Sequence, residues 1–447
     1  MKRDYRLSMA SRVTPALLCA ALLFISTGAN NSVRAQSFGN LQREQGVLML
    51  KNVKNEIKKN YYDPAFRGID IDARFKAAEE KIRQSTSFNQ IFGIIAQALI
   101  EFDDSHLFFI PPSRVNRVDY GWQMQAFGDK VLIVSVKPGS DAEAKGLKPG
   151  DEVLQVNEYQ PVRANMWKLD YLYRTLKPQP GMRLVVQSPE GKPREMVIAA
   201  SVEYRKQTLN FDEGDFYEII REQENENRLN RHRYVELGEE TFIWKMPNFD
   251  LTDQGVDDMM NKIRKRKSLI LDLRGNPGGY VSTLERMAGF FFDRDVKIAD
   301  VKGRKETKPV MAKTRGERAF LGKLVVLIDS KSGSAAEVFA RMVQLEKRGT
   351  VIGDRSSGAV MQSRGGSLTL GSETVIVYGL SVTNADLLMA DGKSIEHVGV
   401  TPDEARLPSP SDLAAKRDPV LARAAEIAGV KIDPEKAGSM FPIEWKK

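Results

Sequence analysis

The chain has 447 residues, of which 42% are hydrophobic and 28% charged, and it carries a formal net charge of +8 at pH 7. This length exceeds one compact core and predicts two or three domains of ordinary globular composition. The charge does not indicate nucleic-acid binding, because basic clusters such as KIRKRK (262–267) end helical patterns, where the helix dipole favours cations.

Residues 1–35 have the pattern of a secretory signal peptide. Basic residues precede the apolar run ALLCAALLFIS (16–26), and Val33-Arg34-Ala35 places small or apolar residues at the two positions that a signal peptidase reads. We therefore expect cleavage before Gln36 and export to a periplasm or to the medium, between which the sequence does not decide. An uncleaved membrane anchor is the alternative, although the run is short for a membrane span.

The single cysteine, Cys19, lies inside that segment, and Leu18 before it fits a lipoprotein cleavage box poorly. A mature chain without cysteine excludes disulfides, thiol catalysis and cysteine metal sites. Because the segment holds five basic residues and one acidic residue, its removal lowers the net charge to +4.

Residues 36–118 form the first predicted domain. Apolar residues recur three and four apart in VLMLKNVKNEIKKNYY (47–62) and FNQIFGIIAQALIEF (88–102), which predicts a small helical domain. The domain ends in EFDDSHLFFIPP (101–112), where the chain turns extended before two prolines.

Residues 119–203 change to a mainly β pattern. The stretch GDKVLIVSVKPGSDAEAKGLKPGDEVLQVNEYQPV (128–162) predicts a strand, a turn, a short helix, a second turn and a second strand, and a helix (166–176) and two strands (182–188, 194–200) follow. Over this length the segment resembles a PDZ domain. The resemblance implies a groove that takes an extended peptide by strand addition, and the alternative is that the domain is only a spacer.

Residues 204–447 predict an α/β domain. A charged connection (204–235) comes first, and strands then alternate with helices, which predicts a largely parallel or mixed sheet. The predicted strands are 241–246, 268–275, 323–329, 350–354, 367–370 and 373–382, and the predicted helices are 255–264, 283–292, 336–344 and 418–429.

The stretch DSKSGSAAEVFARMV (329–343) places Ser334 on a turn between a strand and a helix. Backbone N–H groups at such a turn point toward the serine oxygen and can stabilise an oxyanion, so the position suits a nucleophile. The alternative is that Ser332 or Ser334 is simply the N-cap of the helix.

A second glycine-rich turn, Asn276-Pro277-Gly278-Gly279, ends the buried strand in LILDLRGNPGGYVS (269–282). Glycines there allow close approach of a backbone or substrate, and their N–H groups can attract an anion. An ordinary strand-to-helix turn explains the glycines equally well.

The chain has three histidines, His106, His232 and His397. His232 lies in a basic run and is predicted to be solvated, whereas His106 has a hydroxyl neighbour, Ser105. Histidine is the commonest general base because its ordinary pKa is about 6.5. Glu396 and His397 are adjacent and, on a strand, would point to opposite faces, so both would not serve one site.

Taken together, the helical start, the PDZ-like segment, the DLRGNPGG block, the SGSAAE block and the closing EHVGVTPD block resemble, in order, the carboxyl-terminal processing (tail-specific) proteases and the tricorn core protease. The resemblance implies a crotonase-like, mixed-sheet α/β serine peptidase core. It also implies that Ser334 is the nucleophile. The oxyanion hole would come from the N–H of Ala335 and a glycine of the pair Gly278-Gly279.

The two branches of the family differ in the base. Tail-specific members use a lysine, and Ala359 occupies the matching position in DRSSGAVMQ (354–362). The tricorn-like branch uses a Ser-His pair with a distant glutamate, and Ser105, His106 and Glu396 match these. The resemblance therefore implies that His106 is the base, Glu396 the orienting carboxylate and Ser105 a supporting hydroxyl. Ala335 stands where tricorn has an acidic residue, which sets this chain apart in substrate preference.

We therefore expect an exported serine endopeptidase that cleaves unfolded or C-terminal protein segments held by the PDZ groove, without a metal or cofactor. One rival is an inactive peptide-binding pseudopeptidase, which Ala359 suggests. Another is a ligand-binding protein on the same fold, against which the PDZ-like segment argues. The sequence does not specify the substrate, any adaptor or the oligomeric state.

Overall fold

The computed structural model describes residues 38–446 except 113–115, 205–223 and 372–374. The predicted signal peptide and most of the predicted charged connection therefore lie outside the described residues. The chain divides into two units, Met1–Phe38 and Gly39–Lys447, and every element below belongs to the second. None of the described helices is both long and apolar enough to cross a lipid bilayer.

Three helices open this unit, as the periodicity predicts. They are α1 (Asn40–Asn60), α2 (Ile71–Arg83) and α3 (Phe88–Ile100), with the short helix η1 (Phe66–Gly68) between the first two. Each buries one apolar face, which on α1 includes Met49, Val53 and Ile57. Asp70 and Ser87 begin α2 and α3, because their side chains accept N–H groups of the first turn.

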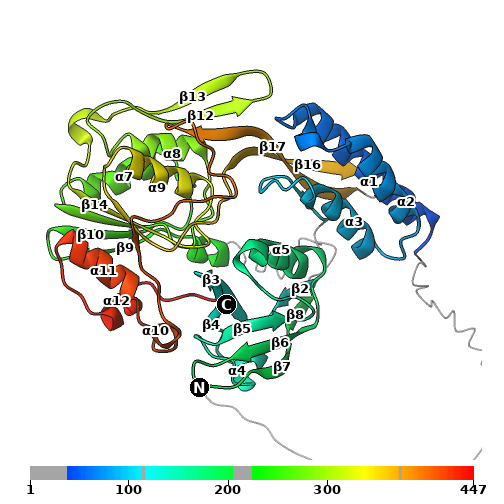
Figure 1. Ribbon diagram of the computed structural model, residues 1–447, viewed down its shortest axis with the longest axis horizontal. Coiled ribbons are helices and arrows are strands. Elements are labelled where there is room, and N and C mark those ends of the chain that lie inside the picture. Colours follow the sequence, from blue (N-terminus) through cyan, green and yellow to red (C-terminus); the bar gives the residue numbers. More distant parts are fainter. Residues whose placement is uncertain (1–37, 113–115, 205–223, 372–374, 447) are drawn as a thin grey trace, which may run out of the picture. The chain divides into compact units, whose positions relative to one another are not determined.

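A five-stranded antiparallel sheet connects these helices to the C-terminal half of the chain. Its strands are β1 (Phe108–Ile110), β12 (Val296–Gly303), β13 (Thr307–Ala312), β16 (Met361–Leu370) and β17 (Ile376–Met389). The long strand β17 pairs with β1, β12 and β16. Helix α1 packs along β16 and β17 (Figure 1), where Asn52 Nδ2 donates a hydrogen bond of 3.0 Å to the Tyr378 hydroxyl.

Residues 116–204 form two further sheets. The first contains β3 (Trp122–Phe127), β4 (Lys130–Val136), β5 (Glu152–Val156), β6 (Gly181–Gln187) and β7 (Arg194–Ala199), in that order, and the second pairs β2 (Asn116–Asp119) with β8 (Ser201–Tyr204). The short helices are α4 (Asp141–Ala144), η2 (Arg163–Asn165), α5 (Met166–Asp170) and η3 (Tyr171–Leu176). Trp122, Ile133 and Leu184 belong to a hydrophobic cluster confined to this segment. The order of elements is the one predicted, while the PDZ assignment remains a prediction.

The third part is a six-stranded sheet in the order β18-β15-β14-β11-β10-β9. Its strands are β9 (Arg233–Leu237), β10 (Thr241–Lys245), β11 (Ser268–Asp272), β14 (Lys323–Ile328), β15 (Thr350–Gly353) and β18 (Glu404–Ala405). All neighbours are parallel except β9 and β10, which confirms the predicted mixed, largely parallel sheet.

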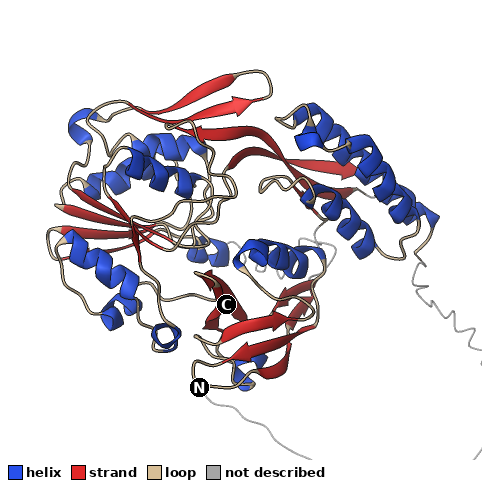
Figure 2. Ribbon diagram, viewed as in Figure 1, coloured by secondary structure: helices blue, strands red, loops and turns tan. Residues whose placement is uncertain are grey.

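Helices cover both faces of this sheet (Figure 2). Because side chains alternate along a strand, Phe242 and Trp244 pack with α7 (Asp253–Ile263), α8 (Val281–Ala288) and α9 (Ala335–Leu345), while Ile243 packs on the other face with α11 (Pro419–Ala428). The remaining short helices are η4 (Gly316–Arg318), α10 (Pro410–Ala414) and α12 (Pro434–Met440).

The sheet brings two turns together. Strands β11 and β14 are parallel neighbours, so the turns that follow them meet at one edge, where ligands of open α/β sheets usually bind. The Gly333 N–H donates to the Asn276 carbonyl oxygen at 2.9 Å, and the Gly275 N–H donates to Asp329 Oδ1 at 2.9 Å. These bonds fix the glycine turn against the turn that carries Ser334.

Candidate active site

Ser334 stands at the N-terminus of α9 in a strained backbone conformation. Its φ and ψ are 50° and −119°, a region that residues with a side chain rarely adopt and that is concentrated at functional sites. A sharp strand-to-helix turn of this kind is what projects a nucleophilic hydroxyl away from the backbone.

The capping interpretation is confirmed for the position of Ser334, which is the N-cap residue of α9, but it does not describe what the hydroxyl does. Ser334 occupies the N-cap position, but its hydroxyl makes no capping hydrogen bond; instead Glu337 accepts the Ser334 N–H at 3.0 Å. Ser332 is fully buried, and its hydroxyl donates to the Leu273 carbonyl oxygen at 2.9 Å while accepting the Asp329 N–H. Ser332 therefore stabilises the turn, and Ser334 keeps its hydroxyl available.

Two backbone N–H groups beside Ser334 can receive an oxyanion. Gly279 and Ala335 line the same cavity as Ser334, and within the described ranges neither N–H group donates to a protein acceptor. Ala335 is the first residue of α9, so the partial positive charge of the helix N-terminus adds to its N–H group.

Gly278 has a different role from the one expected. Its N–H donates to Asn276 Oδ1 at 2.8 Å and is therefore not free for an oxyanion. Within the glycine pair, Gly279 is then the candidate oxyanion donor. A Cβ on Gly278 would lie 2.6 Å from the Cβ of Ser334, and its φ of 103° suits glycine. Gly278 thus permits the close approach of the two turns.

Ser105, His106 and Glu396 form a hydrogen-bonded chain, although 291 positions separate Ser105 from Glu396. The distance between Ser105 Oγ and His106 Nδ1 is 2.7 Å, and Ser105 Oγ lies 2.9 Å from Glu396 Oε2. The Ser105 N–H also donates to Glu396 Oε1 at 3.0 Å. The structure therefore brings together the three residues that the resemblance assigned to the base side.

The donors and acceptors in this chain determine the histidine tautomer. A carboxylate only accepts, so the single proton of the Ser105 hydroxyl points to Glu396, and Ser105 Oγ accepts the proton on His106 Nδ1. Nε2 of His106 then carries the free lone pair. Burial lowers the pKa of His106 below its ordinary value, which keeps the imidazole neutral and able to accept a proton.

Asp104 supports the turn that holds His106. Its side chain is buried and accepts the His106 N–H at 3.0 Å, the Thr383 hydroxyl at 2.6 Å and the Tyr61 hydroxyl at 2.9 Å. These three donors belong to the loop after α3, to β17 and to the end of α1. Asp104 was not singled out from the sequence, where the run DDSH was the only available signal.

His106, Ser334, Gly279 and Ala335 line one cavity of about 310 Å³. The rest of its wall is mostly apolar and comes from α8, α9 and the antiparallel sheet. These wall residues include Leu284, Ile298, Val310, Val338, Met361 and Leu387. The predicted nucleophile, base and oxyanion donors thus face one enclosed space.

The loop that contains Ala359 lies directly beside Ser334. The Ser334 N–H donates to the Ala359 carbonyl oxygen at 2.9 Å, so this is the place where a lysine base would reach the nucleophile. The lysine nearest to Ser334 in sequence, Lys331, is exposed and does not line the cavity.

Glu337 is the functional candidate that the sequence analysis missed. It is 0% exposed and accepts four hydrogen bonds, from Ser334, Ser356, Gly358 and Ala359. The signal available in the sequence was the spacing Ser-x-x-Glu at residues 334–337, which is typical of a capping box.

The other two histidines differ from expectation. His232 is half-buried rather than solvated: its Nδ1 accepts the Trp244 indole N–H at 3.2 Å, and burial lowers its pKa to about 4. Glu396 and His397 lie in a turn rather than on a strand. His397 Nε2 lies 2.9 Å from the Asp103 carbonyl oxygen and 3.5 Å from Glu396 Oε1, so His397 is close to the base side but is not in the cavity wall.

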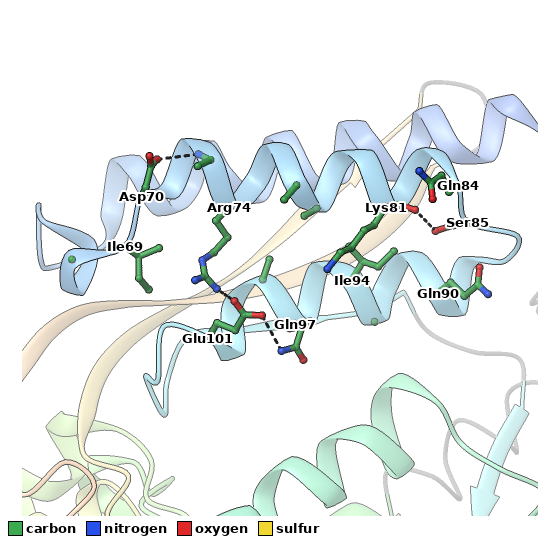
Figure 3. A pocket seen from close by; sticks show the side chains of 16 residues that line it. Ile69, Asp70, Arg74, Lys81, Gln84, Ser85, Gln90, Ile94, Gln97 and Glu101 are labelled. Carbon is green, nitrogen blue, oxygen red and sulfur yellow. Dashed lines mark hydrogen bonds and ion pairs between the residues drawn. The ribbon is translucent and has the colours of Figure 1, made fainter.

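A larger cavity, of about 760 Å³, lies between α2 and α3 (Figure 3). Arg74 on α2 pairs with Glu101, which also accepts the Gln97 side chain at 3.0 Å. Small residues such as Ala77 and Gly93 line the space between the two helices. None of its lining residues pairs a nucleophile with a base, so this cavity, although larger, is not the candidate active site.

The described part of the chain contains no group of three or more His, Cys, Asp or Glu side chains arranged to hold a metal ion.

Comparison with known proteins shows which proteins the chain is similar to. Residues 243–406, which include Ser334 and Glu396, match the model of the family described as Peptidase family S41. Two curated relatives over longer stretches are carboxyl-terminal processing or tail-specific proteases. Residues 243–406 therefore resemble the S41 peptidases, and most of the chain is similar to carboxyl-terminal processing proteases.

The similarity to relatives extends beyond residues 243–406. The chain is 25% identical over 418 residues to the carboxy-terminal processing protease CtpA of Bacillus subtilis, covering 91% of this chain and 78% of CtpA. It is 24% identical over 352 residues to the tail-specific protease of Haemophilus influenzae, covering 74% of this chain and about half (48%) of that protein. Among solved structures, mature CPAF has a TM-score of 0.62 at 14% identity, over 84% of this chain and 94% of CPAF, which shows a shared fold.

Proposed function

We propose that the chain is an exported serine endopeptidase in which Ser334 is the nucleophile, His106 the general base and Glu396 the carboxylate that acts through Ser105. The observation that carries the proposal is the cavity shared by Ser334 and His106. The two residues come from distant segments, yet they line it together with the free N–H groups of Gly279 and Ala335.

The geometry supports a two-step acyl transfer. Ser334 Oγ attacks the peptide carbonyl carbon while its proton passes to His106 Nε2, and the N–H groups of Gly279 and Ala335 stabilise the resulting oxyanion. The imidazolium then gives the same proton to the leaving amine. Water repeats the sequence on the acyl-enzyme, with His106 again taking and returning a proton. Glu396 stabilises the imidazolium through the Ser105 hydroxyl.

The cavity wall supports a preference for an apolar side chain at the cleaved bond. Leu284, Val310 and Val338 contribute aliphatic surface beside Ser334, and burying an apolar group there is favourable by roughly 25 cal/mol per Å². A charged side chain would lose its hydration in the same place without an ion-pair partner.

The PDZ-like segment, predicted as residues 119–203, would hold the rest of the substrate. Strand β3 is an edge strand, and Trp122 and Met124 on it form a small pocket with Leu169 and Tyr173 of the helical stretch 166–176. An edge strand beside a helix is the arrangement that accepts an added peptide strand. This supports unfolded or C-terminal segments as substrates.

Contacts join this segment to the nucleophile turn. Gln125 Nε2 donates to Asp329 Oδ2 at 2.7 Å, and the Ser330 hydroxyl donates to the Ala126 carbonyl oxygen at 2.6 Å. A peptide added to β3 would thus lie on the strand that touches the turn before Ser334.

The location of the enzyme rests on residues 1–35, whose pattern supports export to a periplasm or to the medium. The main alternative function is an inactive peptide-binding pseudopeptidase, because Ala359 stands at the lysine position of tail-specific relatives. The intact chain Ser105-His106-Glu396 favours the active enzyme over this alternative.

Labelling with a fluorophosphonate probe distinguishes the two. The wild-type chain is expected to label at Ser334 and to cleave an unfolded protein, whereas Ser334→Ala and His106→Ala are expected to do neither. Ser367→Ala, an exposed serine on β16, and His232→Ala serve as matched controls. Absence of labelling and cleavage in the wild type would favour the pseudopeptidase, and a fully active His106→Ala variant would show that the base is wrong.

A further inference from the structure

Glu337 is a carboxylate buried directly beneath the nucleophile turn. Its Oε2 accepts the N–H groups of Ser334 and Ala359, each at 3.0 Å. Its Oε1 accepts the Ser356 hydroxyl at 2.6 Å and the Gly358 N–H at 2.7 Å. Each oxygen therefore accepts two hydrogen bonds, and Glu337 donates none to these four partners.

These bonds fix a loop, residues 356–360, between the two halves of the site. On one side Glu337 accepts hydrogen bonds from three residues of the loop, Ser356, Gly358 and Ala359. On the other side the Val360 N–H donates to Glu396 Oε2 at 2.7 Å. The loop thus spans from the carboxylate under Ser334 to the carboxylate behind His106. Its position sets where the nucleophile lies relative to the base.

The hydrogen-bond pattern fits only the ionised form of Glu337. A protonated carboxyl would have to donate, but three of its four partners are backbone N–H groups, which cannot accept. The fourth, the Ser356 hydroxyl, already accepts the Val400 N–H at 2.6 Å, and if its second lone pair accepted the carboxyl proton, the proton of the Ser356 hydroxyl would lose Glu337 as its acceptor. Protonation therefore breaks at least one of the bonds that hold the loop.

Two opposing effects determine when Glu337 is ionised. Burial away from water raises its pKa to about 7, while the four hydrogen bonds and its place in the first turn of α9 favour the charge.

The charged side chains of the neighbouring elements form their contacts elsewhere. Asp354 before the loop pairs with Arg163, Glu396 bonds to Ser105, and Arg341 on α9 pairs with Asp391. His397 faces the Asp103 carbonyl oxygen, and Arg355 offers its carbonyl oxygen to Arg163. The neutral groups named above therefore provide all of the hydrogen bonds to Glu337.

We propose that ionised Glu337 is a positioning residue that locks loop 356–360 and thereby aligns Ser334 with His106, so that the enzyme is switched off by protonation of Glu337 as well as of His106. This inference rests on the proposed peptidase function. Glu337 touches no reacting atom, because its bonds reach only the backbone and one hydroxyl of the turn and loop.

The two groups switch off activity at different pH values. Both must be unprotonated, so activity is lost as the pH falls through each pKa. The pKa of His106 lies below 6.5, whereas that of Glu337 is about 7. Activity in the wild type should therefore begin to fall near pH 7, before His106 is protonated.

The test is the pH dependence of kcat and KM between pH 5 and 9 for the wild type, Glu337→Gln and Ser356→Ala, with Glu346→Gln at the other end of α9 as the control. In Glu337→Gln we expect kcat to fall about tenfold to a hundredfold with KM within about twofold. Its remaining activity should decline only at a lower pH than in the wild type, where His106 becomes protonated. Ser356→Ala removes one donor to the carboxylate, so its acid limb should move to higher pH.

The acid limb is the fall in kcat on the acid side of the pH profile. The inference is supported if this limb moves to lower pH in Glu337→Gln and to higher pH in Ser356→Ala, because a merely structural role would lower the rate without moving either limb. Unchanged limbs in both variants overturn it, and Ser356→Ala decides the matter if Glu337→Gln does not fold. A wild type without Ser334-dependent cleavage would instead overturn the proposed function.

Discussion

Ser334 and His106, which we propose as nucleophile and base, line one cavity, but the two sides of this cavity are held in place differently. Ser334, Ala335 and Gly279 follow two adjacent parallel strands, and short hydrogen bonds between their turns fix them locally. The base side joins the loop that holds His106 to the turn that holds Glu396, through contacts between residues far apart in sequence. The α/β core thus determines the nucleophile geometry by itself, whereas the base geometry depends on long-range contacts that substitutions can break separately.

The largest effect is expected from breaking the base side at Glu396. In Glu396→Gln one of the two acceptor oxygens becomes an NH2 group that faces hydrogen-bond donors, and the negative charge that would stabilise the imidazolium through Ser105 is lost. We expect kcat to fall about 10³- to 10⁴-fold, as for loss of a triad carboxylate, with little change in melting temperature. Steady-state cleavage measures it, with Glu404→Gln on β18 as the control, and a loss below tenfold would argue against the relay.

The next largest effect is expected on the nucleophile side at Gly278. In Gly278→Ala the new Cβ would meet Ser334 at 2.6 Å and push the two turns apart. Because this displaces the Gly279 N–H from the oxyanion, we expect a loss of about 10²- to 10³-fold in kcat and in probe labelling.

The matched control is Gly275→Ala. Gly275 also has a positive φ, 74°, but a Cβ there would meet nothing within 4 Å. It shares the backbone strain without the clash, so we expect nearly full activity. Equal losses in the two variants would mean that strain, and not the close approach to Ser334, explains the effect.

A smaller effect is expected from Thr383→Val, which keeps the shape of the side chain but removes the hydroxyl that donates to buried Asp104 at 2.6 Å. We expect the free energy of unfolding to fall by about 1–3 kcal/mol, because a buried carboxylate loses a donor. Since Asp104 holds the His106 backbone, kcat should fall several-fold. Denaturant unfolding measures the change in stability and steady-state kinetics measures kcat, with exposed Thr307→Val as the control. An unchanged kcat would mean that Asp104 does not help to position His106.

The smallest effect is expected from Lys331→Met. If the base is His106, removing the lysine closest to Ser334 in sequence should leave kcat within about twofold of the wild type. A large loss, with His106→Ala still active, would mean that a lysine acts as the base and that the long-range base side has no catalytic role. Cleavage assays on both variants decide between the two.

The α/β part of the fold could be predicted because its strands and helices carry strong, short-range patterns. Fully buried strands such as β11 and β14 have continuous apolar runs, and α9 has a clear helical period. The β12–β13 hairpin was not predicted, although Val296, Ile298 and Val310 in it are buried, because its apolar residues are few and the pairing of β12 with β17 arises only on folding. The length of β17 also depends on three partner strands, and no local pattern specifies these.

The site was predictable where it rests on turn chemistry and motif order, and less so where it rests on tertiary contacts. Ser334, Gly279 and Ala335 stand in turns that the residue types indicate. Glu337 reads as an ordinary residue of a first helical turn, because burial and its three distant partners appear only after folding. Asn276, by contrast, accepts the N–H of Gly278 two residues further on, a local turn that its residue type indicates.

The backbone conformation of Ser334 costs folding stability at the residue that we propose as the nucleophile. A φ of 50° with ψ at −119° is unfavourable for every side chain and tolerated by glycine. Ser334→Gly should therefore be inactive yet more stable than Ser334→Ala, by about 1 kcal/mol in the free energy of unfolding. The difference between these two variants in denaturant unfolding would measure how much folding stability the protein gives up to hold its hydroxyl in place.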